Sequence, residues 1–472
     1  MSNDIAASTL LAPTMLTEDT WDVVVLGTGV SGSAAAVTVA RSGARVLWIE
    51  KSAEPGGSAA LSAGLFWTAP NVRAYLDRIP LGNQSLAERL ITDYPEALAE
   101  IRSTGITVAD TPKHGVMTFG IGYKLDIRAL LTWCRETVTA NGGMLLTQTT
   151  ATEIITDDER VTGVRLRTAE GEYFDVHAGA VVLATGGFQG DPEELSRHMG
   201  PNSDRLKLRS NAGSVGDGLR MARAVGAAAT KGMSTFYGHL VPAPLRNFEP
   251  ADYLPLAQFY SSHTVLLNGA GVRFCDETQG DEILNQELAR QPGARGVLVF
   301  DDAVRWNAAR EEPEPGLGAV DRIAAATGAG ARYSTANTVE AALAPIEAWG
   351  FDSARASRTL MDYRRAIETG RRFADGVPVA ESASPPMTAP FHVLEVQPTI
   401  TFTLGGIRID ASGRVLDHDG APIAGLFAAG ADIGGISNYG YAGGLAPGYI
   451  TGRWAGSSAA RHAATGTAAG NR

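Results

Sequence analysis

Three glycines near the start of the chain are spaced as GxGxxG. Gly27, Gly29 and Gly32 follow a short apolar run and precede a run of small residues, as the turn between the first strand and helix of a nucleotide-binding unit requires. Gly27 allows a tight turn, Gly29 lets the backbone approach a pyrophosphate, and Gly32 lets helix and strand pack closely. Glu50 ends a second apolar run, where a carboxylate binds ribose hydroxyls and disfavours a 2′-phosphate. The spacing therefore predicts a dinucleotide site.

Three further glycine-rich segments narrow the choice of dinucleotide: Glu54–Ser58, Ala184–Gly187 and Gly425–Asp432. Together with the first motif they resemble the FAD-dependent oxidoreductases that include fumarate reductase flavoproteins and 3-ketosteroid Δ1-dehydrogenases. The resemblance extends over nearly the whole chain and implies FAD as the cofactor. Relatives with covalent flavin carry a His near the Gly-Gly-Ser segment. Residues 57–64 contain no His, so we expect the FAD to be non-covalent.

The resemblance also implies roles for particular residues. Asp432 would hold the flavin ribityl chain, and the backbone at Ala151 would contact adenine. The start of the last helix, near Leu445 and Ala446, would point at the flavin pyrimidine edge, where the helix dipole stabilises negative charge. The other expected FAD contacts are Gly27, Gly29, Val30, Ser31, Gly32, Glu50, Lys51, Gly56, Gly57, Ser58, Ser62, Ala63, Gly64, Ala184, Thr185, Gly186, Gly430 and Gly444.

One position separates the two chemistries of this group. The acid/base residue lies four residues after a Gly-x-Arg-Phe-x-Asn/Asp-Glu segment, and it is Arg in fumarate reductases and Tyr in Δ1-dehydrogenases. Here the segment is Gly271–Glu277 and the position is Asp281. Phe402 replaces a family His, and residues 434–444 lack the family's carboxylate-binding Arg. Because carboxylates prefer bidentate cationic partners, fumarate is not the expected substrate.

A tyrosine in the C-terminal segment favours a ketone instead. Tyr441–Gly443 resembles the Tyr-Ala-Gly of ketosteroid dehydrogenases, and residues 64–70 resemble their Gly-x-x-Trp-x-Pro stretch. The resemblance implies that the Tyr441 hydroxyl and a backbone N–H bind the ketone oxygen, which acidifies the α-hydrogen. We therefore expect Asp281 to take the α-proton while flavin N5 accepts the β-hydride, giving an α,β-unsaturated ketone. The chain is short for a steroid dehydrogenase, which favours a smaller ketone such as a cyclohexanone carrying a carboxylate.

Other readings of these residues stay open. Tyr439 is a rival to Tyr441, and Asp281 could instead cap the helix that follows it. A substrate carboxylate could be bound by Arg246 or Lys124. The expected substrate-pocket residues are Tyr123, His239, Tyr260 and Tyr439.

The pattern of elements predicts an α/β fold: a Rossmann-like FAD-binding domain of the glutathione reductase type, split by an inserted α+β cap. We expect a flexible lead-in over 1–19, an FAD-binding domain from 20–232 and 388–472, and a cap over 233–387. The predicted strands are 22–26, 45–50, three within 152–177, 180–183, 405–410 and 425–429, and the predicted helices are 33–42, 83–106, 126–141, 339–348, 354–369 and 446–460.

Composition limits the partners. The 472-residue chain has a net charge of −11, which argues against nucleic acid because phosphate binding needs a basic surface. Two cysteines provide neither a disulfide framework nor a metal site, and no apolar run reaches bilayer length. We expect a cytoplasmic enzyme without metal, acting on a small molecule with an electron acceptor that the sequence does not specify. The alternatives are a reductase of activated C=C bonds and a non-catalytic flavin-binding redox protein.

Overall fold

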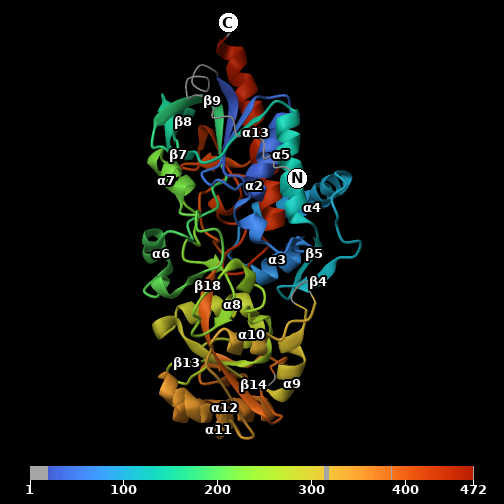
Figure 1. The fold of residues 1–472 in the computed structure, drawn as a ribbon, viewed down its shortest axis with the longest axis vertical. Helices are drawn as coiled ribbons and strands as arrows, with labels where there is room; N and C mark the ends of the chain where they lie inside the picture. Colours follow the sequence, from blue (N-terminus) through green and yellow to red (C-terminus); the bar gives the residue numbers. More distant parts are fainter. Residues whose placement is uncertain (1–19, 313–317, 384, 471–472) are drawn as a thin grey trace, which may run out of the picture.

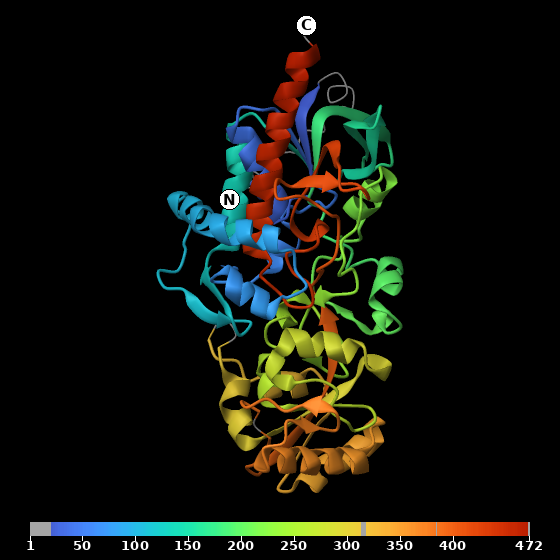
Figure 2. The same ribbon diagram turned by 180° about the vertical axis from the view of Figure 1, so that it is seen from behind.

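The computed structural model describes residues 20–312, 318–383 and 385–470. The predicted lead-in, residues 1–19, lies outside them. Figure 1 shows an elongated molecule with a nucleotide-binding part at one end and a cap at the other, and Figure 2 shows the C-terminal helix running along the former. Among the described residues, no helix is both long enough and apolar enough to cross a bilayer.

The nucleotide-binding part is built on a mostly parallel sheet in the order β6-β2-β1-β9-β21-β20. β1 (Trp21–Leu26) pairs in parallel with β2 (Val46–Ile49) and with β9 (Tyr173–Leu183), and β9 pairs in parallel with β21 (Pro422–Ala428). The central strands are apolar and fully buried because helices and a hairpin cover them. The remaining strands of this sheet are β6 (Met144–Leu146), β7 (Thr150–Asp157), β8 (Arg160–Arg167) and β20 (Arg414–Leu416).

The expected β-meander is present with one difference. β7, β8 and β9 form consecutive antiparallel pairs. The strand predicted at 180–183 is not separate, because β9 continues from the meander directly into the parallel sheet. A single long strand thus joins the two sheet regions.

Two helices rich in small residues pack along each other beside the dinucleotide turn. α2 (Val30–Arg41) begins directly after it, and α13 (Leu445–Gly470) packs along α2. Gly452 on α13 allows this close approach, since a Cβ there would lie 2.2 Å from the Ser31 carbonyl oxygen. The two helices therefore begin near each other, beside the carboxyl ends of the sheet strands (Figure 1).

The cap has its own sheet, organised around the ten-residue strand β18 (Phe391–Ile400). β18 pairs with β12 (Leu240–Pro242), β14 (Gly296–Asp301) and β15 (Tyr333–Ala336), and its last residues pair with β10 (Lys207–Leu208). β13 (Val265–Asn268) adds to β14. Helices α8 (Asp281–Ala289), α10 (Arg322–Gly328), α11 (Val339–Leu343) and α12 (Ser353–Glu368) contribute residues to its two apolar clusters.

β18 pairs with the cap strands although it lies after the predicted cap boundary at residue 387. One strand prediction is wrong. Residues 405–410 form no strand and make only isolated bridges through Ile407 and Ile409, because this segment crosses between the two parts.

Helix α3 and strands β4 and β5 lie near the junction of the two parts (Figure 1). β5 pairs with both β3 and β4 to form a small sheet. These elements and the others not yet given are β3 (Leu65–Thr68), α3 (Val72–Arg78), α4 (Gln84–Ser103), β4 (Lys113–Val116), β5 (Gly120–Lys124), α5 (Ile127–Ala140), α6 (Pro192–Met199), α7 (Asp217–Ala224), β11 (Phe236–Tyr237), α9 (Asp302–Trp306), β16 (Phe373–Ala374), β17 (Val377–Pro378) and β19 (Phe402–Thr403).

Candidate active site

A cavity of about 630 Å³ lies between the nucleotide-binding part and the cap. Its size is within the range of small-molecule and cofactor sites. One end is formed by the dinucleotide turn after β1. The other end is formed by aromatic and polar residues from the cap and from the segment before α13. Its volume and its two chemically different ends suit a dinucleotide cofactor next to a small substrate.

The dinucleotide end has the shape that a pyrophosphate requires. Gly29 precedes α2, and no side chain caps this helix end. A Cβ on Gly29 would meet no protein atom within 4 Å, so the helix N–H groups face open space. Gly27 has a φ of +101°, and a Cβ there would lie 2.2 Å from the Ala184 carbonyl oxygen. A glycine is therefore needed at 27 for the fold, whereas the space at Gly29 is available to a bound phosphate.

Glu50 lies on the cavity wall at the end of β2 and is held in place by its neighbours. Its carboxylate accepts hydrogen bonds from the Thr28 N–H at 3.2 Å, from the Thr28 hydroxyl, and from the Ser52 N–H at 2.8 Å. Both Thr28 bonds go to one carboxylate oxygen, so the oxygen that accepts from Ser52 keeps acceptor capacity. The residue fits the predicted role of binding ribose hydroxyls.

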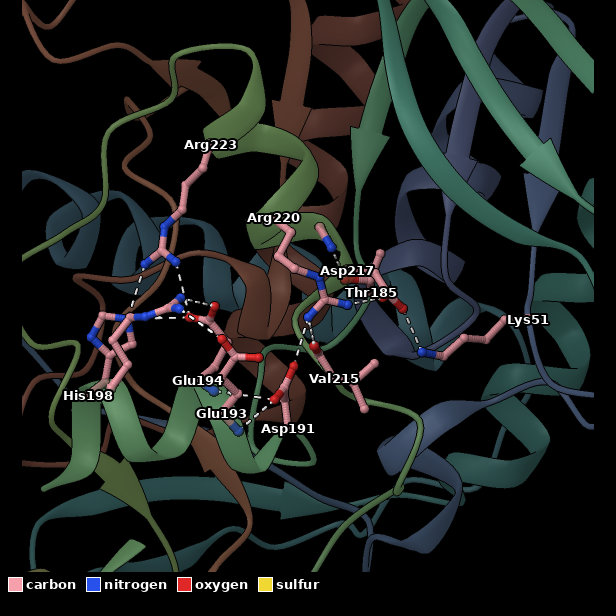
Figure 3. A network of polar contacts seen from close by, with 12 residues as sticks. Lys51, Thr185, Asp191, Glu193, Glu194, His198, Val215, Asp217, Arg220 and Arg223 are labelled. Atoms are coloured by element: carbon pink, nitrogen blue, oxygen red, sulfur yellow. Dashed lines mark hydrogen bonds and ion pairs between the residues drawn. The ribbon is translucent and has the colours of Figure 1, made fainter. Parts of the chain in front are cut away.

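Lys51, the next cavity residue, is neutralised by an ion-pair network. Its ammonium lies 2.6 Å from Asp217, which also binds Arg220 at 2.6 Å, and Arg220 in turn binds Asp191 at 2.8 Å. Figure 3 shows this chain running from Lys51 towards α6 and α7. The network holds the Lys51 side chain in an ion pair at the cavity wall.

The opposite wall is formed by the start of α13. Gly443, Gly444 and Leu445 line the cavity where the positive end of the helix dipole points into it. The predicted contact of this helix start with the flavin pyrimidine edge stays a prediction.

Asp432 differs from expectation. It is buried and does not line the cavity. Its carboxylate accepts hydrogen bonds from the Thr185 hydroxyl at 2.9 Å and from the Gly187 N–H at 3.0 Å. Burial raises the pKa of this carboxyl. The residue therefore fixes the ATGG loop against the segment after β21.

Most of the predicted FAD contacts line this cavity, and six do not. Gly32, Gly56, Gly64, Ala151 and Ala446 join Asp432 outside the cavity wall. Gly32 and Gly64 lie where backbone oxygens leave no room for a Cβ, so they are required by the fold. The predicted residues that line the cavity are Gly27, Gly29, Val30, Ser31, Glu50, Lys51, Gly57, Ser58, Ser62, Ala63, Ala184, Thr185, Gly186, Gly430, Gly444 and Leu445.

Two stacked tyrosines form the centre of the substrate end. The rings of Tyr441 and Tyr237 are 3.8 Å apart and within 18° of parallel. Trp67 packs edge-on against Tyr441 at 5.2 Å. The Tyr441 hydroxyl lies beside Gly444, 3.0 Å from where a Cβ would be. Tyr441 thus lines the cavity next to the start of α13.

Asp281 is displaced from the role that the sequence predicted. It is buried behind the wall, and its carboxylate binds His239 Nδ1, the Leu240 N–H at 3.2 Å and the Ser261 hydroxyl at 3.2 Å. With Nδ1 directed at a carboxylate, His239 Nε2 is the acceptor for the Tyr237 hydroxyl at 2.6 Å. The result is a hydrogen-bonded chain, Tyr237–His239–Asp281, in which only the first two members line the cavity.

Three predicted pocket residues do not reach the cavity. The Arg102 guanidinium lies over the Tyr123 ring, with its Cζ 4.6 Å from the ring centre. Tyr260 is packed against Phe300 in the cap core. Tyr439 donates a hydrogen bond to Glu287 at 2.9 Å, which removes it as a rival to Tyr441. His239 is the member of this set that lines the cavity.

Tyr237 and Arg209 are among the polar cavity residues that sequence reasoning missed. Tyr237 precedes His239 by two residues, and this spacing places both on one face of an extended segment. That spacing is a usable signal. Arg209 carries no motif, and only the pairing of β10 with β18 brings it to the site. Within the described ranges, no group of three or more His, Cys, Asp or Glu residues could hold a metal ion.

Comparison with known sequences also indicates an FAD-binding protein. Residues 22–445 match the FAD binding domain family. Over 92–96% of the chain, it is 28% identical to an NADH:fumarate oxidoreductase of Klebsiella pneumoniae, a vinyl phenol reductase of Lactiplantibacillus plantarum and a 4-oxocyclohexanecarboxylate 2-dehydrogenase of Sinomonas cyclohexanicum. The chain spans 48% of the length of the first relative, 98% of the second and 92% of the third.

Structural comparison identifies the same fold. The structure of a 3-ketosteroid Δ1-dehydrogenase from Sterolibacterium denitrificans, in complex with 1,4-androstadiene-3,17-dione, superimposes with a TM-score of 0.72 at 18% identity. The match covers 94% of this chain and 99% of the other. The chain belongs to the FAD binding domain family and is an FAD-dependent oxidoreductase of the group that contains fumarate reductase flavoproteins and 3-ketosteroid dehydrogenases.

Proposed function

We propose that the protein is an FAD-dependent dehydrogenase of a cyclic ketone, a 3-ketosteroid or a smaller ring, that forms an α,β-unsaturated ketone. The observation that carries this proposal is the Tyr237–His239–Asp281 chain beside Tyr441, at the start of α13. These groups supply a carbonyl-binding hydroxyl next to a base, which is what removal of a proton α to a ketone requires. Bound FAD supplies the acceptor for the β-hydride.

Tyr441 binds the ketone oxygen in this scheme. Its hydroxyl lies beside Gly444, where the backbone N–H groups at the start of α13 also favour negative charge. Donors placed in advance stabilise the enolate that forms as the α-proton leaves. The aromatic packing of Trp67 and Tyr237 holds the Tyr441 ring in position.

Tyr237 takes the α-proton as its own hydroxyl proton passes to His239 Nε2. Burial lowers the pKa of His239, with a further lowering by Arg209, so the imidazole is neutral and able to accept at neutral pH. The Asp281 carboxylate stabilises the imidazolium and fixes the ring orientation. The base assigned to Asp281 from sequence is therefore replaced by a relay in which Asp281 is the last member.

A reductase of activated C=C bonds is the second candidate. Two relatives named above, the NADH:fumarate oxidoreductase and the vinyl phenol reductase, support it. In the reductase direction, Tyr237 would donate a proton to the substrate carbon. The relative named 4-oxocyclohexanecarboxylate 2-dehydrogenase supports the dehydrogenase direction.

The test is anaerobic mixing of the FAD-loaded protein with a panel of cyclic ketones, including 4-oxocyclohexanecarboxylate and a 3-ketosteroid. We expect loss of the oxidised flavin absorbance with a ketone, and formation of the enone. Tyr237→Phe and Tyr441→Phe should each slow flavin reduction by at least about 100-fold while binding FAD normally. Tyr173→Phe, an exposed tyrosine of the meander, is the control.

Reoxidation of dye-reduced enzyme by enones, without reduction by any ketone, would establish the reductase instead. Failure of both reactions would indicate a non-catalytic flavin protein.

A further inference from the structure

Arg209 places a cation in the substrate end of the cavity. It follows β10, and its backbone N–H donates to the Ile400 carbonyl at 2.8 Å, which fixes the start of the side chain. Its guanidinium donates to the Tyr253 carbonyl at 3.2 and 3.3 Å and to the Thr401 hydroxyl at 3.3 Å. These bonds use three of its five N–H groups. At least two donors are left for a ligand.

No carboxylate of the described residues forms a direct ion pair with Arg209, and the Asp281 charge that acts on it is itself bonded to His239. Of the described residues that line the cavity, Glu50, Lys51 and Arg209 carry formal charges. Lys51 is paired with Asp217, and Glu50 lies at the ribose end with its own donors. The oxygens bonded to Arg209 are both neutral, and burial lowers the pKa of its guanidinium. The two N–H groups that remain lie on a cavity-lining side chain with no direct carboxylate partner, so they suit a ligand that brings a negative charge.

The neighbours of the Arg209 guanidinium show which part of a substrate it would contact. Arg209 interacts electrostatically with Tyr237 and Tyr441, and all three line the same cavity as His239. A small ring whose ketone oxygen is bound by Tyr441 would therefore present its far side to Arg209. Arg246, which the sequence offered for such a role, is exposed and does not line the cavity.

We propose that Arg209 binds a carboxylate of the substrate, so that the enzyme acts on a small cyclic keto acid rather than on a neutral ketone. The inference rests on the proposed function for the ketone end, but the carboxylate subsite stands on Arg209 itself. A planar guanidinium binds a carboxylate with two parallel hydrogen bonds. This subsite is separate from the carboxylate-binding arginine that residues 434–444 lack.

A binding experiment tests the subsite without turnover. Isothermal titration of the FAD-loaded protein with 4-hydroxybenzoate, its methyl ester and 4-methylphenol compares one ring with and without the carboxylate. We expect the acid to bind at least about 10-fold more tightly than the ester, because a charge-assisted bidentate contact is lost in the ester. Equal affinities for acid and ester would overturn the proposal, and this comparison needs no variant.

The variant Arg209→Met removes the cation and keeps an apolar side chain. We expect about 10- to 100-fold weaker binding of 4-hydroxybenzoate, with little change for 4-methylphenol. Arg246→Met is the matched control and should change neither. Loss of 4-methylphenol binding to the same extent would assign Arg209 a purely structural role.

Turnover separates this proposal from the proposed function. Flavin reduction by 4-oxocyclohexanecarboxylate, faster at low concentration than by cyclohexanone, supports both. Equal reduction by acid and neutral ketone supports ketone dehydrogenation and removes the carboxylate subsite. If the acid binds through Arg209 but no ketone reduces the flavin, the subsite stands and ketone dehydrogenation fails.

Discussion

Tyr237, His239 and Asp281 act as one unit, although they come from two separate parts of the cap sequence. Asp281 begins α8, and the other two lie at β11 and just before β12. The Asp281 side chain touches His239 and not the cavity, so it is a positioning residue. A change at Asp281 should therefore act on the basicity of His239 rather than on substrate binding.

Asp281→Asn is expected to lower kcat by about 100- to 10,000-fold, with FAD retained and KM little changed. The Asp281 charge raises the pKa of His239 against the lowering by burial. Its removal lowers that pKa further, so the acidic limb of kcat/KM should move to lower pH. The pH profile distinguishes this from a merely structural loss. Asp362→Asn, an exposed acid on α12, is the control. Wild-type turnover in Asp281→Asn would remove the relay.

At the scale of elements, the close packing of α13 on α2 places both helix N-termini at the cavity. Gly452 contacts the Ser31 backbone and Gly456 that of Ala35. Ser31 and Val30 are themselves cavity residues. The spacing of four residues between these glycines keeps them on one face of α13. Stability and FAD binding are therefore coupled through this contact.

Gly452→Val should destabilise the protein by roughly 1–3 kcal/mol, because α13 must move away from α2 to admit the side chain. It should also weaken FAD binding, since the α2 N-terminus moves with it. Thermal unfolding and FAD titration measure the two effects. Ala464→Val lies on the exposed face of the same helix and controls for the lower helix propensity of Val. Identical behaviour of the two variants would show that the contact is not tight.

At the scale of the whole molecule, contacts of α8 with α3 and with the segment before α13 join the cap to the nucleotide-binding part. Arg78 at the end of α3 lies 2.9 Å from Glu282 on α8. Gln286 on α8 donates to the Tyr439 carbonyl at 2.6 Å. Burial raises the pKa of Glu282 to about 7, although Arg78 lowers it. The junction therefore contains a carboxyl that titrates near neutral pH.

This titration predicts a pH-dependent stability. The Glu282 pKa is about 7 in the folded state and about 4.5 when unfolded, so the folded state binds more protons between these values. Stability is then lost as pH rises from about 4.5 through about 7, by at most roughly 3 kcal/mol. In Glu282→Gln this slope should vanish.

The measurement is the urea midpoint of the FAD-loaded protein at pH 5, 6, 7 and 8, for wild type, Glu282→Gln and the exposed control Glu193→Gln. The difference between Glu282→Gln and wild type should grow with pH. Parallel curves would show that Glu282 keeps an ordinary pKa.

The sequence by itself determined the nucleotide-binding half of the site. Gly27, Gly29 and Glu50 could be placed because a local backbone turn and two adjacent strands define their geometry. The glycines mark positions where a side chain would prevent a close approach to the backbone. Tyr441 followed from its neighbouring motif.

Tertiary structure decided which residues we propose for catalysis and substrate binding, since these depend on contacts between distant segments. The pairing of β10 with β18 brings Arg209 to the cavity, and α8 turns Asp281 onto His239 rather than towards the cavity. Spacing along the chain gives the position of a residue, but burial and hydrogen-bond partners decide which way its side chain points.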